Sequence, residues 1–221
     1  MTYDELLHVL KASADEKMAT FHGGLIKAPK ERLLGVKTPV LRKLAKQMYV
    51  EELLSFPNEF YEVKFIKLVA VSYLPYERFI QYLDRVIGLI DNWALCDSFK
   101  ANCIKNRKKE FLPTIEKYHA SGKEFSVRYA LVCLLSYYVE EEYVPYIFNL
   151  LKRTDCSAYY VHMAAAWLTA EILVKHYKDG IEFLNQRTLP PKTQNKAIQK
   201  SMESYRLNKE QKEYLKTLKI K

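Results

Sequence analysis

Glycine is scarce in this chain, with six residues among 221. Average proteins contain roughly 7% glycine, so the number is well below the ordinary level. Because glycine supplies positive φ angles at tight turns and helix ends, few places remain where the chain can turn sharply. The sequence also shows no strand-like alternation of polar and apolar residues. Long helices and an all-α fold are therefore predicted.

Long apolar runs are also missing. No stretch of about 18 consecutive apolar residues occurs, as a membrane-spanning helix would require. Residues 1–17 contain acidic side chains where a secretion signal would carry cations. We therefore expect a cytoplasmic protein that makes no membrane contact, and we expect it to be a monomer.

Cysteine and histidine form no ligand or redox motif. The cysteines are Cys96, Cys103, Cys133 and Cys156. They contain no C-x-x-C pair, and each lies in an apolar helical pattern, which is typical of reduced core thiols. The histidines show no spacing such as H-E-x-x-H. We expect neither a metal site nor a cofactor.

Charge gives the first indication of a partner. The chain has 35 basic and 26 acidic side chains, for a net charge of +9. A positive excess of this size favours a polyanionic partner. Nucleic acid is the leading interpretation, while a membrane surface or simple solubility remain alternatives.

Four similar apolar segments carry a cation or histidine at a matching position. These four, which we name the ladder residues, are Lys64, Arg128, His162 and Lys196. Their intervals are 64, 34 and 34 residues, so the first interval has room for one more repeat. In that interval Asp97 takes the matching position, 33 residues after Lys64 and 31 before Arg128.

A period in the low-to-mid thirties with two helices per unit is typical of an α-solenoid of HEAT-like repeats. We predict a single domain, residues 1–221, forming a right-handed superhelix of about five or six helical pairs. The inner helices are expected at 62–74, 125–139, 159–173 and 193–204. Outer helices are expected at 76–90, 109–119 and 142–152. An irregular helical bundle with coincidental spacing remains the alternative.

One segment combines an aromatic with a carboxylate. Trp93 and Asp97 are one helical turn apart and should project to the same side, with Lys100 near that face. Arg128, at the matching position of the next repeat, would stand beside Asp97 and hold it ionised. The alternative is a structural Asp–Arg pair, with Trp93 in the core.

The ladder residues would form a concave basic face together with cations from two other segments. These additional residues are Arg42, Lys43, Lys105, Arg107, Lys108 and Lys109. Such a face suits the sugar-phosphate backbone of a DNA duplex, through contacts that position without reading sequence. A simply solvated face is the alternative.

Four motifs together resemble a known family. They are "LLGVKTPVLRKLAK" (33–46), "NWALCDSFKA" (92–101), "SVRYALVCLLSYY" (126–138) and "HMAAAWLTAEIL" (162–173). In this order they resemble the HEAT-like-repeat DNA glycosylases, the AlkD-type DNA alkylation repair proteins. The resemblance implies a monofunctional glycosylase that binds double-stranded DNA. It would hydrolyse the N-glycosidic bond of N3- and N7-alkylpurines that already carry a positive charge.

The resemblance also implies roles for individual residues. Trp93 and Asp97 match the family's Trp-x-x-x-Asp helix, Arg128 matches its catalytic-site arginine, and Trp167 matches the second aromatic beside the lesion. Asp97 would stabilise the cation that develops on the deoxyribose and orient a water. The two tryptophan faces would attract the same charge.

Two positions depart from the family pattern. Ala94 stands where an acidic residue is common. The segment before the "LGV" turn contains Gly23, Gly24 and Pro29, which are poor helix formers. It resembles a paralogous branch that lacks the helix entering the minor groove, and it predicts slow excision or none. A non-catalytic, weakly DNA-binding HEAT-repeat paralogue is therefore the alternative function.

Overall fold

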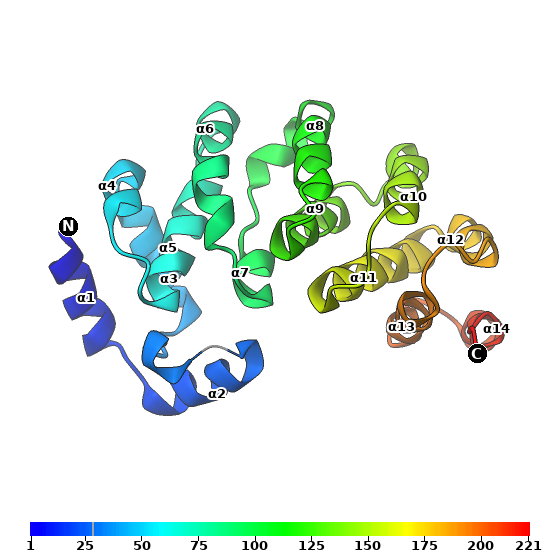
Figure 1. The fold of residues 1–221 in the computed structure, drawn as a ribbon, viewed down its shortest axis with the longest axis horizontal. Coiled ribbons are helices and arrows are strands. Elements are labelled where there is room, and N and C mark those ends of the chain that lie inside the picture. Colours follow the sequence, from blue (N-terminus) through cyan, green and yellow to red (C-terminus); the bar gives the residue numbers. More distant parts are fainter. Residues whose placement is uncertain (28) are drawn as a thin grey trace. The chain divides into compact units, whose positions relative to one another are not determined.

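The computed structural model describes residues 1–27 and 29–221, and all regular structure in these residues is helical (Figure 1). The helices of the first half are α1 (Tyr3–Ala12), α2 (Glu16–Ile26), α3 (Thr38–Gln47), α4 (Val50–Ser55), α5 (Tyr61–Ser72), α6 (Tyr76–Val86) and α7 (Trp93–Ser98). Those of the second half are α8 (Lys108–Ala120), α9 (Glu124–Tyr137), α10 (Val144–Lys152), α11 (Tyr159–Lys175), α12 (Tyr177–Asn185), α13 (Pro191–Met202) and α14 (Lys209–Thr217). The all-α prediction is confirmed.

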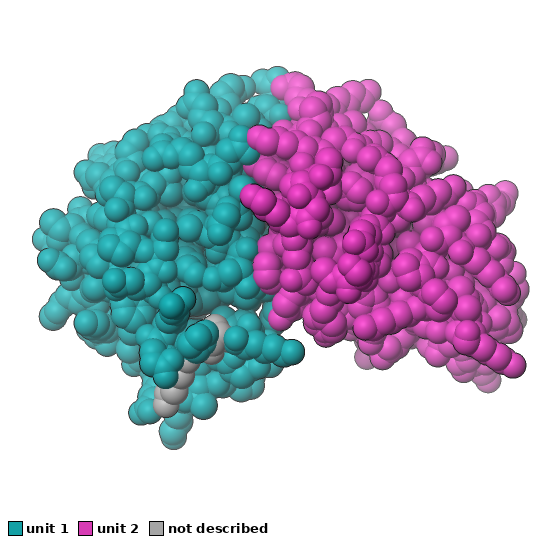
Figure 2. All heavy atoms as spheres, viewed as in Figure 1, with its two compact units in different colours: residues 1–107 teal, residues 108–221 magenta. Residues whose placement is uncertain are grey.

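The chain divides into two compact units, residues 1–107 and 108–221 (Figure 2). In a stack of repeats each repeat contacts mainly its neighbours, so such a division does not decide the number of domains. A single domain stays a prediction.

The first unit is organised around α5. This helix packs against α3, α4, α6 and α7. Its core side chains include Val63, Ile66 and Val69, which are completely buried. The inner helix expected at 62–74 is therefore present and buried on nearly all sides.

In the second unit one row of helices packs against another. Helix α11 contacts both α9 and α13, while α8, α12 and α14 pack against α9, α11 and α13 respectively. The expected inner helices 125–139, 159–173 and 193–204 agree with α9, α11 and α13 to within two residues at each end. The paired helices confirm the helical-solenoid pattern predicted from the period.

A tight turn precedes α3. Gly35 has φ +78°, and a Cβ there would stand 2.1 Å from the carbonyl oxygen of Asp15. The buried Glu62 carboxylate accepts hydrogen bonds from the backbone N–H groups of Leu34 and Gly35, at 3.0 and 2.8 Å. Gly35 is thus in the left-handed conformation, and Pro39 lies in the first turn of α3. Lys37 is the N-cap of α3, and its side chain makes no capping hydrogen bond.

Helix α2 corrects an expectation about the N-terminal region. Gly23 and Gly24 lie inside this 11-residue helix instead of breaking it. The Asp15 side chain caps its start by accepting from the N–H of Met18 at 3.1 Å. The helix ends at Lys27 in the left-handed conformation. The capped first turn and the buried Ala19, Gly23 and Ile26 outweigh the weak propensity of two glycines.

Candidate functional site

The short helix α7 carries the predicted aromatic and carboxylate. The buried Asn92 side chain fixes its start by accepting from the N–H of Leu95 at 3.0 Å. Trp93 and Asp97, both half-buried, are one turn apart and share a side of this helix. The prediction that Lys100 lies on the same helical face is wrong, because α7 ends at Ser98.

Trp93 is held by the last turn of α2. Its indole N–H donates to the carbonyl oxygen of Leu25 at 3.2 Å. In a continuing helix this carbonyl would accept from residue 29, but Pro29 has no N–H to donate. The indole supplies the missing donor, so α2 sets the orientation of the Trp93 ring.

Helix α2 also exposes large apolar side chains. Phe21 is 64% exposed and Leu25 is 48% exposed. They are four residues apart and therefore lie on one side of the helix. Because the Leu25 carbonyl contacts Trp93, this apolar edge lies next to the aromatic of the predicted site.

Lys64 forms an ion pair instead of standing free. Its Nζ lies 2.5 Å from Oδ2 of Asp91, and Oδ1 of Asp91 accepts from the amide of Asn92 at 2.9 Å. Its side chain is only 16% exposed. A small cavity of about 60 Å³ lies beside the pair and is also lined by Arg32 and Glu59. The pair joins α5 to the start of α7, so Lys64 holds the Trp93 helix in place.

Arg128 is buried in the second unit. Its Nη1 donates to the backbone carbonyl of Tyr160 at 3.1 Å, and its guanidinium lies 6.0 Å from the centre of the Tyr160 ring. Arg128 therefore ties α9 to α11. Asp97 belongs to the first unit, and its pairing with Arg128 stays a prediction.

The predicted phosphate-binding role of His162, another ladder residue, does not agree with its position. The residue is 2% exposed, and its Nδ1 lies 2.9 Å from the hydroxyl of Thr193. Burial lowers the pKa of His162, and the positive charges of Lys192 and Lys196 lower it further. An imidazole buried to this extent is not accessible for the phosphate contact that was expected. Lys196 is half-exposed and donates to Gln199 at 2.9 Å.

Two of the ladder residues, Arg128 and His162, thus link one repeat to the next. Arg128 bonds a residue 32 positions later, and His162 bonds one 31 positions later. The period of the sequence indicated that these positions are equivalent in successive repeats. It did not indicate whether the side chain faces solvent or the next helix, because that depends on burial. Sequence reasoning missed the partners Tyr160 and Thr193, as well as the carbonyl of Leu25.

The remaining predicted cations differ in their surroundings. Lys43 and Lys105 are exposed, and Arg42 lies 5.6 Å from the centre of the Phe65 ring. The other three form ion pairs: Arg107 with Glu77, Lys108 with Glu140 and Lys109 with Glu142, at 3.5, 2.5 and 3.1 Å. Carboxylates therefore offset part of the positive cluster. Lys105 belongs to a 3-10 turn, Arg107 directly follows this turn, and Lys108 and Lys109 begin α8, so none of them is in the helix of Trp93.

Trp167 lies on α11 in the second unit and is 37% exposed. Tyr159, at the start of the same helix, is 56% exposed. Both aromatics are accessible to a ligand of that unit. A site shared by Trp167 and Trp93 stays a prediction, since the two residues belong to different units.

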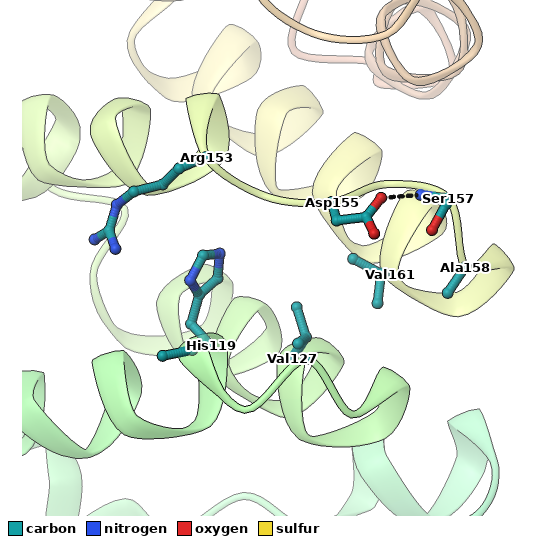
Figure 3. A pocket seen from close by; sticks show the side chains of 9 residues that line it. His119, Val127, Arg153, Asp155, Ser157, Ala158 and Val161 are labelled. Carbon is teal, nitrogen blue, oxygen red and sulfur yellow. Dashed lines mark hydrogen bonds between the residues drawn. The ribbon is translucent and has the colours of Figure 1, made fainter.

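A larger pocket of about 390 Å³ lies elsewhere in the second unit (Figure 3). Its polar groups already have partners. His119 Nε2 lies 2.9 Å from the hydroxyl of Thr154, and Arg153 makes two hydrogen bonds with the Glu116 carboxylate at 2.7 and 2.8 Å. Asp155 accepts from the N–H of Ser157, the dashed contact in Figure 3. This pocket lies between neighbouring repeats and contains none of the predicted site residues.

A comparison with family models decides the family. The model described as DNA alkylation repair enzyme matches residues 5–202, which is nearly the whole chain. The chain belongs to this family. Membership supports a role in DNA repair and an interaction with DNA, in agreement with the resemblance of the four motifs. A comparison with curated proteins finds no match.

Within residues 1–27 and 29–221, no helix has both the length and the apolar character needed to cross a membrane. The matched range 5–202 contains α2, α7, α9 and α11, and with them Trp93, Asp97, Arg128 and Trp167.

Proposed function

We propose that this member of the DNA alkylation repair enzyme family is a DNA glycosylase for positively charged N3- and N7-alkylpurines in duplex DNA. The observation that carries the proposal is the Trp93–Asp97 pair on α7, with the Trp93 ring fixed by the Leu25 carbonyl of α2. An aromatic face and a carboxylate one turn apart provide two groups that can stabilise a developing cation.

The departing base needs little catalytic assistance from the protein. An N3- or N7-alkylated purine already carries positive charge, so it can leave without strong protonation by a general acid. As the glycosidic bond breaks, positive charge develops on the deoxyribose. Asp97 stabilises this charge and orients the attacking water, while the face of Trp93 packs on the sugar. Arg128 and Trp167 complete the proposed site from the second unit.

Helix α2 supports the proposal of glycosylase activity over the non-catalytic alternative. The expectation of slow or absent excision rested on a missing helix before the "LGV" turn, and α2 occupies this place. Its exposed Phe21 and Leu25 resemble the apolar wedges that other proteins insert in the minor groove. We propose that this edge contacts the groove and presses the lesion's sugar towards Trp93.

A second function rests on a different observation. Arg128 and His162 are buried, so two of the four ladder residues cannot bind phosphates. A duplex would then rely on fewer cations, as expected of a non-catalytic, weakly DNA-binding family member. Wild-type DNA affinity without base release would favour this alternative.

Base release from methylated duplex DNA tests the proposal. Wild-type protein should release 7-methylguanine and 3-methyladenine, and Asp97→Asn should abolish release while leaving DNA affinity nearly unchanged. The amide keeps the shape of the side chain but removes the charge that stabilises the sugar cation. Asp84→Asn, at an exposed position of α6, is the matched control and should retain wild-type release. Equal release by wild type and Asp97→Asn would refute the role of Asp97.

A further inference from the structure

Two amide side chains of α13 hold the segment 218–221. The Asn195 amide donates to the carbonyl of Ile220 at 2.8 Å, and its oxygen accepts from the N–H of the same residue at 2.9 Å. The neighbouring Gln194 donates to the carbonyl of Leu218 at 2.9 Å. Asn195 thus pairs with both backbone groups of Ile220, as a neighbouring strand would.

This contact occupies the position of a repeat joint. Arg128 ties α9 to α11, and His162 ties α11 to α13. Asn195 directly precedes the last ladder residue, Lys196, and ties α13 to the segment after α14. Helix α14 packs on α13 in the same way that α12 packs on α11, so it takes the place of an outer helix. Residues 218–221 follow α14 and therefore take the place in the chain where a next inner helix would begin.

The fixed segment places two cations beside α13. Lys219 and Lys221 are exposed, whereas the alternating Leu218 and Ile220 are partly covered. On α13, Lys192 precedes Asn195 by one turn and therefore lies on the same side of the helix. The positive charges of Lys192 and Lys196 also help to lower the pKa of the buried His162 on α11.

We propose that Lys219 and Lys221 bind backbone phosphates of the duplex, and that Asn195 is the clamp that positions them. The inference rests on the proposed DNA-binding function and adds a contact region outside the residues matched by the family model, 5–202. It replaces part of the phosphate contact that the buried Arg128 and His162 do not provide.

The clamp matters because a freely moving lysine loses conformational entropy when it binds. Two hydrogen bonds to Ile220 fix the backbone between the two cations before DNA arrives. Each phosphate that is neutralised should add about 0.9 to the slope of log affinity against log salt concentration. Two such contacts should therefore add about 1.8 to the slope.

The test measures duplex affinity as a function of salt for the full chain and three variants. Lys219→Gln with Lys221→Gln should lower the salt slope by about 1.8 and weaken binding on the order of tenfold at 0.1 M salt. Asn195→Ala keeps both charges and should still weaken binding several-fold, because the segment is released. Lys178→Gln with Lys209→Gln removes two exposed cations from α12 and α14 and should leave the slope near the wild-type value. Circular dichroism melting checks that each variant is folded.

The possible outcomes distinguish failure of the proposed DNA binding from failure of the lysine contacts or of the Asn195 clamp. Absence of wild-type binding at low salt would overturn the proposed DNA function and this inference together. A steep wild-type slope that Lys219→Gln with Lys221→Gln leaves unchanged would overturn this inference alone. An equal loss in the Lys178→Gln, Lys209→Gln control would show that net charge, not the clamped segment, determines affinity. Wild-type affinity in a folded Asn195→Ala variant would refute the clamp.

Discussion

At the scale of single residues, Trp93 donates one hydrogen bond to a carbonyl in the last turn of α2. Trp93→Phe keeps most of the ring but removes the indole N–H, which leaves the Leu25 carbonyl without this partner. We expect a loss of about 1 kcal/mol in the free energy of unfolding, measured by urea titration with circular dichroism. Trp167→Phe, at an exposed position, is the control and should cost less. Equal losses would indicate that the indole hydrogen bond contributes nothing.

Lys67 offers a second residue-scale test. It is 1% exposed on α5, and its Nζ donates to the Phe56 carbonyl at 2.5 Å and to the Asn58 side chain at 2.7 Å. Burial lowers the pKa of Lys67 to about 8. Since the unfolded lysine has a pKa near 10.4, the unfolded state binds more protons between these two values, and stability should rise with pH.

The change should be visible in urea titrations between pH 7 and pH 10. Wild type should gain stability across this window relative to Lys67→Met, which cannot titrate there. Lys43→Met, at an exposed position, should follow the wild-type pH dependence. A parallel pH dependence in wild type and Lys67→Met would show that the pKa of Lys67 is not lowered.

At the scale of elements, two glycines test how α2 is built. Gly24 lies inside α2, and a Cβ there would have no heavy atom within 4 Å. Gly24→Ala should therefore increase the free energy of unfolding by roughly 0.5–1 kcal/mol, because alanine loses less backbone entropy in a helix. Gly35→Ala should destabilise severely, since its φ is +78° and the new Cβ would collide with the Asp15 carbonyl. Thermal melting of both variants provides the measurement, and destabilisation by Gly24→Ala would contradict the helical assignment.

The elements also show what sequence can predict. The inner helices α9, α11 and α13 were predictable because each has an apolar pattern repeated at one period. Helix α2 was not, because glycine propensity is a weak local effect, whereas the Asp15 cap and the burial of Ile26 come from the folded surroundings.

The site was predictable to a similar extent. The spacing of Trp93 and Asp97 already placed them on one side of a helix. The contacts that Arg128 and His162 make with the next helix were not predictable, because sequence gives a repeated position but not whether its side chain faces solvent or the next helix. Their burial, and the carbonyl and hydroxyl they contact, emerge only from packing.

At the scale of the whole molecule, the net charge of +9 predicts salt-dependent binding to duplex DNA. Individual cations should contribute unequally. Lys105 is exposed, whereas the Lys108 side chain is 18% exposed and paired with Glu140. Lys105→Gln should lower the salt slope by about 0.9, and Lys108→Gln should lower it less. Binding titrations on two unrelated duplex sequences would check this, and equal effects would show that the ion pair does not hold Lys108 away from DNA.

The central claim is that Asp97 and Trp93 excise bases whose positive charge makes them good leaving groups. The most direct measurement is single-turnover base release from matched duplexes that contain either cationic 7-methylguanine or neutral uracil, with protein in excess. We predict release of 7-methylguanine and none of uracil, because neither Asp97 nor Trp93 is a strong acid able to activate a neutral base. Failure to release 7-methylguanine, or equal release of both bases, would contradict the account.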